Sequence, residues 1–186
     1  MQQNQIYDIY ISVGYLSSHI EAHLQKYNNT KINISIVKEN KPLGTAGPLS
    51  LLKGIDDDLV VINGDILTDL NLSNFHNFFK SNQSLVTILT IPLNTNIPFG
   101  VLTIDENKYI TNIKEKPTIK SYISGGCYIF DKKVIKTIPE KKYIEMTDFL
   151  EYLINKKVRI SSYAYHGTWI DAGNWEDLKR AKALFV

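Results

Sequence analysis

The run Leu59–Ile62 (LVVI) constrains the fold of this chain more than any other segment. Four consecutive apolar residues are followed by Asn63, Gly64 and Asp65. A short, continuous apolar run of this kind is typical of a strand that is buried on both faces of a sheet. Helices must then cover both faces, so the run predicts a three-layer sandwich.

The segments around this run alternate between strand and helix patterns. We predict further strands at residues 6–13, 32–37, 85–91 and 158–164, and helices at 17–27, 49–52, 71–81, 148–155 and 174–184. Ser73 and Asn174 are the expected N-caps of the helices 71–81 and 174–184. Strands that alternate with helices indicate a Rossmann-like α/β fold with a mostly parallel, mixed sheet.

The pattern changes after Pro98, where short strand patterns follow one another without helices. They are GVLTID (100–105), the run 109–115 and SGGCYIF (124–130). We interpret them as a small β-rich insertion that lies against the main sheet.

Composition limits the class of protein. A length of 186 residues with 44% hydrophobic side chains suits one core, so we expect a single domain over residues 1–186. The net charge of +2 comes from dispersed residues without a basic run, which argues against a nucleic-acid partner. Cys127 is the only cysteine, and we find neither a signal peptide nor a membrane-spanning apolar run. We therefore expect a soluble, cytoplasmic protein without a membrane partner.

Two carboxylates stand where an α/β sheet takes its ligands. Asp65 follows the buried run, and Asp171 follows Trp169 and Ile170. Ligands of open α/β sheets gather at the carboxyl ends of strands, and a pair of carboxylates there would suit Mg2+. The alternative is that each aspartate only caps a following turn or helix.

Two further segments carry polar chemistry. The segment 41–49 (KPLGTAGPL) is a glycine-containing turn that enters a helix, where main-chain N–H groups can approach a ligand. It is not a P-loop, because the lysine and hydroxyl residue of that motif do not follow its second glycine. Glu115 and Lys116 would suit sugar hydroxyls and a phosphate. A tight turn and a solvated ion pair are the alternatives.

The order of these motifs resembles the sugar-1-phosphate nucleotidyltransferases, which make nucleoside-diphosphate sugars. The resemblance runs from about Ile6 to the end of the chain. The sequences of these motifs are most similar to those of the mannose-1-phosphate and heptose-1-phosphate guanylyltransferases, and thymidylyl and cytidylyl relatives are further candidates. The motifs that carry it are PLGTAGPL, VVINGDILTDL, FGVLTID, IKEKP, GGCYIF and TWIDAGNWEDLKRA.

The resemblance implies a reaction and its partners. A sugar 1-phosphate attacks the α-phosphorus of a nucleoside triphosphate, and a nucleoside-diphosphate sugar of the GDP-mannose type and pyrophosphate are released. Asp65 and Asp171 would share the Mg2+ cofactor, and Lys116 would meet the sugar phosphate as a third catalytic residue. The nucleotide would contact Gly44, Thr45 and Ala46, and the sugar phosphate Gly100, Glu115, Lys116, Ser124, Gly125 and Glu145.

The sequence also departs from the family pattern. The family opens with a buried strand, a glycine-rich loop with an essential arginine and a Pro-Lys-Pro segment, whereas this chain begins with the family's second strand. We therefore expect the family's first strand to be missing from the sheet. Either the chain is a fragment of a longer enzyme, or a partner segment or second copy completes the sheet, or the sheet has rearranged.

Two other function classes remain open. The first is a catalytically silent module that binds a sugar nucleotide. The second is a metal-dependent glycosyltransferase with a similar fold. The latter needs two acidic residues separated by one residue at the strand end, whereas Ile66 and Leu67 follow Asp65. The release of pyrophosphate distinguishes an enzyme from the silent module.

Overall fold

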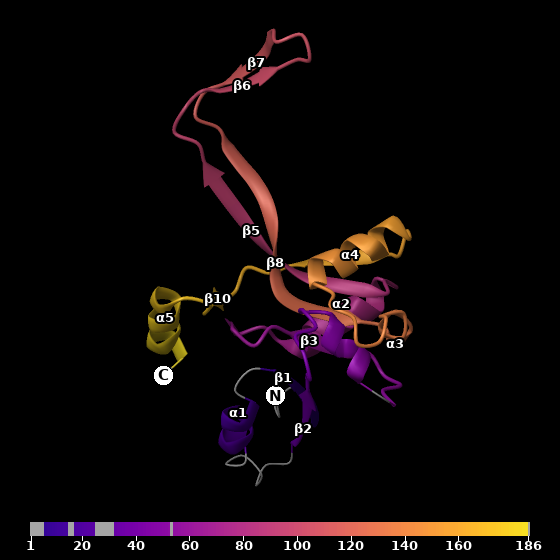
Figure 1. Ribbon diagram of the computed structural model, residues 1–186. Helices are drawn as coiled ribbons and strands as arrows, with labels where there is room; N and C mark the ends of the chain where they lie inside the picture. The colour runs from indigo at the N-terminus through magenta and orange to yellow at the C-terminus, as the bar shows by residue number, and fades with distance from the viewer. Residues whose placement is uncertain (1–5, 15–16, 25–31, 53, 186) are drawn as a thin grey trace.

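The computed structural model describes residues 6–14, 17–24, 32–52 and 54–185 (Figure 1). The elements in chain order are β1 (Asp8–Val13), α1 (Ser17–Leu24), β2 (Asn33–Lys38), the 3-10 helix η3 (Gly47–Leu51), β3 (Leu59–Ile62), β4 (Ile66–Thr68), α2 (Leu72–Ser81), β5 (Val86–Asn96), β6 (Val101–Ile104), β7 (Ile110–Lys114), β8 (Thr118–Phe130), α3 (Lys132–Ile135), α4 (Met146–Asn155), β9 (Ile160–Ala164), β10 (Trp169–Asp171) and α5 (Trp175–Phe185).

The main sheet has the strand order β3-β8-β5-β9. Strand β8 runs antiparallel to both β3 and β5, whereas β5 and β9 are parallel. Three strands therefore share one direction and β8 alone runs against them. This is the mixed, mostly parallel sheet that the sequence predicts.

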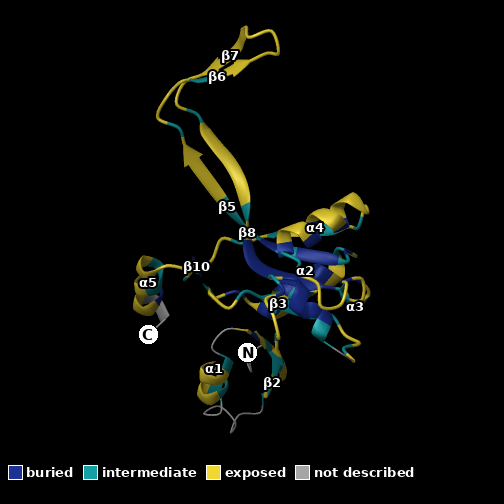
Figure 2. Cartoon of the chain, in the orientation of Figure 1, coloured by how far each residue is buried: buried dark blue, intermediate teal, exposed yellow. Residues whose placement is uncertain are grey.

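The inner half of β8 is buried on both faces, so its alternating side chains divide the core into two clusters. Cys127 and Ile129 lie with Phe75 of α2, and Phe130 lies with Phe149 of α4. Figure 2 shows this buried centre between the two helices. Burying one such large apolar side chain stabilises the fold by roughly 1.5–3 kcal/mol. The helices lie on opposite faces, which confirms the predicted three-layer sandwich.

The β-rich insertion has a different position from the predicted one. Strands β5 and β8 stay paired from Val86 and Phe130 out to Asn96 and Thr118, so the chain between them can only continue outward. We call the outer halves of β5 and β8, together with β6 and β7, the arm. Figure 1 shows β6 and β7 at the far end of the arm, away from the core. The prediction that the insertion lies against the main sheet is wrong, and the segment 124–130 belongs to the core strand β8.

One face of the β6–β7 hairpin is apolar and exposed. Leu102 pairs with Ile113 and Ile104 pairs with Ile110, with Thr111 as an extra residue in the irregular register. All four aliphatic side chains are exposed (Figure 2). Within the described residues the hairpin thus gains little from burial, and two-stranded ribbons of this kind are marginally stable by themselves.

Strands β1 and β2 form a separate parallel pair. In the described part of the chain, β3 lies at the edge of the main sheet and pairs only with β8. This arrangement agrees with the expectation that the family's first strand is missing from the sheet and leaves a neighbouring strand unpaired. The predicted helix 17–27 is described as far as Leu24, and its last three residues lie outside the described residues.

The helix ends test the predicted caps. Asn71, not Ser73, is the N-cap of α2, because its side-chain oxygen accepts from the N–H of Asn74 at 2.9 Å. Asn174 caps α5 as predicted and accepts from the N–H groups of Glu176 and Asp177, each at 3.0 Å. No helix in the described ranges is long and apolar enough to cross a bilayer.

Candidate functional site

Asp65 and Asp171 are brought together by two short strands that the sequence patterns did not predict. Strands β4 and β10 pair antiparallel, with Asp171 opposite Ile66. The N–H of Ala172 then donates to the carbonyl oxygen of Asp65 at 2.8 Å. The convergence of the two carboxylates, which sequence reasoning could only suggest, is therefore a feature of the fold.

Both carboxylates face a glycine. A Cβ added at Gly173 would lie 3.0 Å from Asp171 Oδ1 and 3.9 Å from Asp65 Oδ2. Asp171 Oδ1 accepts from the Gly173 N–H at 2.9 Å, so this aspartate does cap a turn, as the alternative reading expects. Both aspartates are exposed. They therefore leave carboxylate oxygens on one open surface next to Gly173.

The chemistry of this acidic pair suits a hard divalent cation. Among the described residues no group of three or more histidine, cysteine, aspartate or glutamate side chains could hold a metal. Mg2+ needs no such group, because it usually takes one or two carboxylates and completes its shell with waters and substrate phosphates. Two neighbouring exposed carboxylates therefore fit Mg2+ with a phosphate ligand better than they fit an ion held by protein ligands alone.

A bulge in β8 contacts the turn that carries Asp65. The register between β5 and β8 shifts at Ile88/Thr90, opposite Gly125 and Gly126, and Gly126 has a φ of +67°. The carbonyl oxygen of Gly126 accepts from the N–H of Asn63 at 2.9 Å. Bulges of this type re-aim the chain and are common beside functional sites. The double glycine inside a strand pattern is a sequence signal that could have predicted this bulge, although the sequence analysis did not use it.

Ser124 and Gly125, predicted to contact the sugar, are engaged within the protein. The Ser124 hydroxyl lies 2.9 Å from the hydroxyl of Tyr128. The Gly125 carbonyl accepts from the indole N–H of Trp169 at 2.8 Å, and a Cβ on Gly125 would meet Leu89 at 2.9 Å. Tight packing thus explains the glycine, and a sugar contact at these two positions stays a prediction.

A second polar network lies at the other end of β4 and β10 from the acidic pair and was missed by the sequence analysis. The Asp69 carboxylate accepts from the Tyr165 hydroxyl and from the Thr168 N–H, the latter at 2.8 Å. The hydrogen bond from Tyr165 holds the pKa of Asp69 below its ordinary value. Burial, together with the Asp69 carboxylate, raises the pKa of Tyr165 to about 12. Tyr165 therefore stays a hydrogen-bond donor at neutral pH.

The loop of Gly44, Thr45 and Ala46 packs against the segment before α4. Gly44 has a φ of +75°, and a Cβ there would lie 2.5 Å from the carbonyl oxygen of Ile144. The N–H of Thr45 donates to Glu145 at 3.3 Å, and the N–H of Ala46 donates to the Ile144 oxygen at 2.9 Å. Those two N–H groups are occupied in this arrangement. That the loop lines the nucleotide site stays a prediction.

Glu145 joins this loop to helix α4. Its carboxylate accepts from the hydroxyl groups of Tyr143 and Thr45, the latter at 2.8 Å. The Thr45 hydroxyl oxygen in turn accepts from the N–H of Met146 at 2.7 Å. The bonds from Tyr143 and Thr45 hold the pKa of Glu145 below its ordinary value. The carboxylate therefore has a clear structural task, and its predicted contact with the sugar phosphate stays untested.

The predicted sugar-phosphate residues Gly100, Glu115 and Lys116 lie together on the arm. A Cβ on Gly100 would be 3.2 Å from Glu115 Oε2. Lys116 has a φ of +44°, and its N–H donates to the Phe99 oxygen at 3.2 Å. Figure 1 shows the arm leading away from β10. In the described ranges no hydrogen bond or ion pair links these residues to Asp65 or Asp171.

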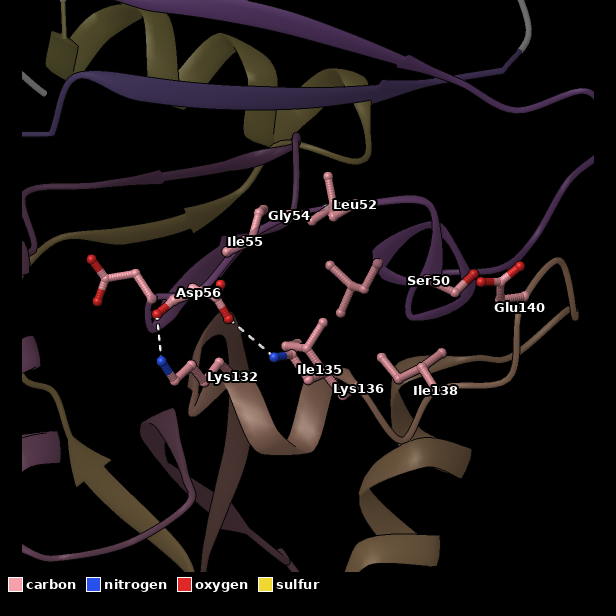
Figure 3. A pocket seen from close by; sticks show the side chains of 12 residues that line it. Ser50, Leu52, Gly54, Ile55, Asp56, Lys132, Ile135, Lys136, Ile138 and Glu140 are labelled. Atoms are coloured by element: carbon pink, nitrogen blue, oxygen red, sulfur yellow. Dashed lines mark hydrogen bonds and ion pairs between the residues drawn. The ribbon is translucent and has the colours of Figure 1, made fainter.

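A separate pocket of about 330 Å³ lies between η3, the segment before β3 and α3 (Figure 3). Its wall includes Leu49, Ile135 and Ile138. Lys132 Nζ donates to the carbonyl oxygen of Asp56 at 2.7 Å, and Lys136 pairs with the Asp56 carboxylate at 3.1 Å. The pocket contains none of the predicted site residues, and its two lysines are bonded to Asp56. We therefore place the candidate site at the acidic pair.

A three-layer sandwich with an acidic pair just beyond the carboxyl end of β3 belongs to the α/β proteins that take ligands at strand ends. The chain is a member of the nucleotidyl transferase family, whose sequence model matches residues 1–185. This membership confirms the resemblance found in the sequence.

Individual relatives agree with the family. Mannose-1-phosphate guanylyltransferase of Mycobacterium tuberculosis is 29% identical over 186 residues, which cover 96% of this chain and 51% of that protein. Mannose-1-phosphate guanyltransferase of Debaryomyces hansenii is 30% identical, with 96% and 52% covered. The crystal structure of HddC from Yersinia pseudotuberculosis has a TM-score of 0.75 and 26% identity, and covers 100% of this chain and 81% of that one. The chain spans about half the length of the curated relatives it matches.

Proposed function

We propose that this chain takes part in nucleotidyl transfer from a nucleoside triphosphate to a sugar 1-phosphate. The observation that carries the proposal is the pairing of Asp65 with Asp171 across β4 and β10. Guanosine triphosphate and mannose 1-phosphate are the proposed substrates, because the curated relatives are mannose-1-phosphate guanylyltransferases. The products are then GDP-mannose and pyrophosphate.

In this proposal Asp65 and Asp171 would hold Mg2+, which would supply positive charge to offset the negative charge of the triphosphate. An oxygen of the sugar phosphate forms a bond to the α-phosphorus, and the bond from that phosphorus to the bridging oxygen of pyrophosphate breaks. Such transfers depend on positioning and charge more than on covalent work by the protein. Glu115 would accept from sugar hydroxyls, and Lys116 would donate to the sugar phosphate.

Glu115 and Lys116 lie on the arm, so either the arm moves toward the acidic pair or the bound sugar phosphate reaches from the arm to the acidic pair. Glu115 and Lys116 lie at the junction of the two parts of the arm, where Gly100, Pro117 and the left-handed Lys116 interrupt the ladder. We propose that this junction bends when a sugar phosphate binds.

The loop of Gly44, Thr45 and Ala46 is the proposed contact for the nucleotide base.

We further propose that another segment completes the sheet beside β3. Strand β3 is an edge strand in the described part of the chain, although its side chains are half-buried. An edge strand leaves main-chain N–H and C=O groups without ladder partners, which favours the addition of a strand. A longer polypeptide, a partner segment or a second copy of the chain would each supply one.

The test is pyrophosphate release by the purified chain with Mg2+, mannose 1-phosphate or glucose 1-phosphate and each nucleoside triphosphate in turn. We expect release with guanosine triphosphate and mannose 1-phosphate. We expect it to be lost in Asp65→Ala and kept in Glu151→Gln, which removes an exposed carboxylate of α4.

The pattern of outcomes separates the candidate functions. If guanosine triphosphate binds without turnover, and Asp65→Ala weakens this binding, the chain is a silent binding module. Release that persists unchanged in Asp65→Ala contradicts the proposal, because the reaction would not use the acidic pair.

A further inference from the structure

The acidic pair depends on the register of a very short strand pair. Strands β4 and β10 share only three residue pairs, and Asp171 is the last residue of β10. A slip of one residue turns every side chain of a strand to the opposite face. Such a slip would turn Asp171 away from Asp65. Three pairs provide little free energy against it, so other contacts must set the register.

Those contacts lie at the other end of the two strands. Asp69 directly follows β4, and Thr168 directly precedes β10. The Asp69 carboxylate accepts from the Thr168 N–H at 2.8 Å, and the Asp69 N–H donates to the Thr168 oxygen at 3.3 Å. The two residues are thus bound to each other by main chain and by side chain. One of these bonds uses the carboxylate and would not survive a shift of β10 by one residue.

Tyr165 fixes the Asp69 carboxylate to the main sheet. Its hydroxyl donates to Asp69 Oδ1, and its own N–H donates to the carbonyl oxygen of Thr90 on β5 at 2.9 Å. These bonds leave no room for a side chain at the neighbouring Gly167. A Cβ at Gly167 would collide with the Tyr165 hydroxyl and would lie 2.8 Å from Asp69 Oδ1. The turn from Tyr165 to Thr168 is thereby closed around one carboxylate.

We propose that Asp69 and Tyr165 are positioning residues, which set the register of β10 on β4 and so hold Asp171 beside Asp65. The inference rests on the proposed function, since it gives the register a purpose in cation binding. Neither residue touches the reacting atoms. Their effect passes through main-chain pairing to the acidic pair. Loss of an outer contact of this kind typically costs about 10-fold to 100-fold in metal affinity.

The test is the affinity of the full chain for Mn2+, followed by the electron paramagnetic resonance signal of the free ion. Tyr165→Phe removes only the hydroxyl, and we expect a loss of about 10-fold in Mn2+ affinity. Tyr163→Phe is the matched control, because Tyr163 lies two residues earlier and packs its ring on Phe75 and Phe78. We expect it to bind Mn2+ like the wild-type chain.

A second variant keeps the test decisive if Tyr165→Phe fails to fold. Asp69→Asn keeps an oxygen for the Thr168 N–H but loses the charge, and we expect weaker Mn2+ binding at an unchanged fold by circular dichroism. Mn2+ affinity that equals the wild type in both folded variants overturns the inference.

Asp65→Ala separates this result from a failure of the proposed function. If Asp65→Ala abolishes Mn2+ binding and the Asp69 and Tyr165 variants do not weaken it, only the inference is wrong. If Asp65→Ala binds Mn2+ like the wild type, the acidic pair is not the cation site and both proposals are wrong.

Discussion

The main-chain N–H of Ala172 donates to the carbonyl oxygen of Asp65 at 2.8 Å, and this bond places two carboxylates from distant parts of the chain side by side. The main chain, not the carboxylates, makes the contact. The side chains of Asp65 and Asp171 are both exposed. Removing either carboxylate should therefore change chemistry and leave the fold intact.

Asp171→Asn tests this separation of function from stability. We expect kcat/KM for pyrophosphate release to fall by roughly 100-fold to 1000-fold, as for the loss of one preorganised electrostatic group. The melting temperature should change by less than about 2–4 °C, the shift expected for 1 kcal/mol in a chain of this size. An equally large loss in Glu151→Gln would point to a general charge effect instead.

Thr45→Val tests the connection between the glycine-containing loop and α4. Glu145 occupies the N-cap position of α4 without a side-chain cap bond, and Thr45 supplies the missing oxygen to Met146. We expect the free energy of unfolding to fall by about 0.5–2 kcal/mol, the usual cost of a lost cap, as measured in urea. Thr45→Ser keeps the hydroxyl and should cost less. Equal costs for both variants would contradict the capping role.

Gly44→Ala tests the left-handed turn in the same loop. The φ of +75° alone costs a non-glycine residue roughly 1–2 kcal/mol, and the Ile144 carbonyl 2.5 Å from the new Cβ adds a clash. Gly14→Ala is the control, because nothing lies within 4 Å of its added Cβ. We expect the urea concentration at the midpoint of unfolding to fall strongly in Gly44→Ala and to change little in Gly14→Ala. Similar midpoints would show that the loop adapts freely.

The pH dependence of stability should report on Asp69. Its pKa is lower in the folded chain than its ordinary value of 3.8, because Tyr165 and Thr168 donate to the carboxylate. The unfolded chain therefore binds a proton more readily. The lowered pKa of Asp69 therefore stabilises the folded chain above pH 3.8, and this stabilisation is lost as the pH falls through the folded pKa. The melting temperature of Asp69→Asn should fall less steeply on acidification than that of the wild type.

The layered core was predictable because its signals are local. The apolar run Leu59–Ile62 alone indicates a strand covered on both faces, and β3 has those bounds in the structure. Periodicity likewise located α2 and α4. The expectation of a single domain stays a prediction.

The site was predictable only in part, because its geometry depends on pairings between distant segments. Strands of three residues, such as β4 and β10, are too short to show a period. The Asp69–Tyr165 contact joins positions far apart in the chain, and an Asp before a helix gives no sign of a distant tyrosine. The arm was misplaced because alternation fixes which side chains share a face but not where a hairpin points.

A double-mutant cycle on the acidic pair tests the central claim most directly. Asp65→Asn, Asp171→Asn and the double variant would be compared by kcat/KM for pyrophosphate release with guanosine triphosphate and mannose 1-phosphate. Residues that act as one unit are strongly non-additive. We predict that the double variant loses about as much activity as either single variant. Losses that multiply would show that Asp65 and Asp171 act independently, and would contradict a shared cation site.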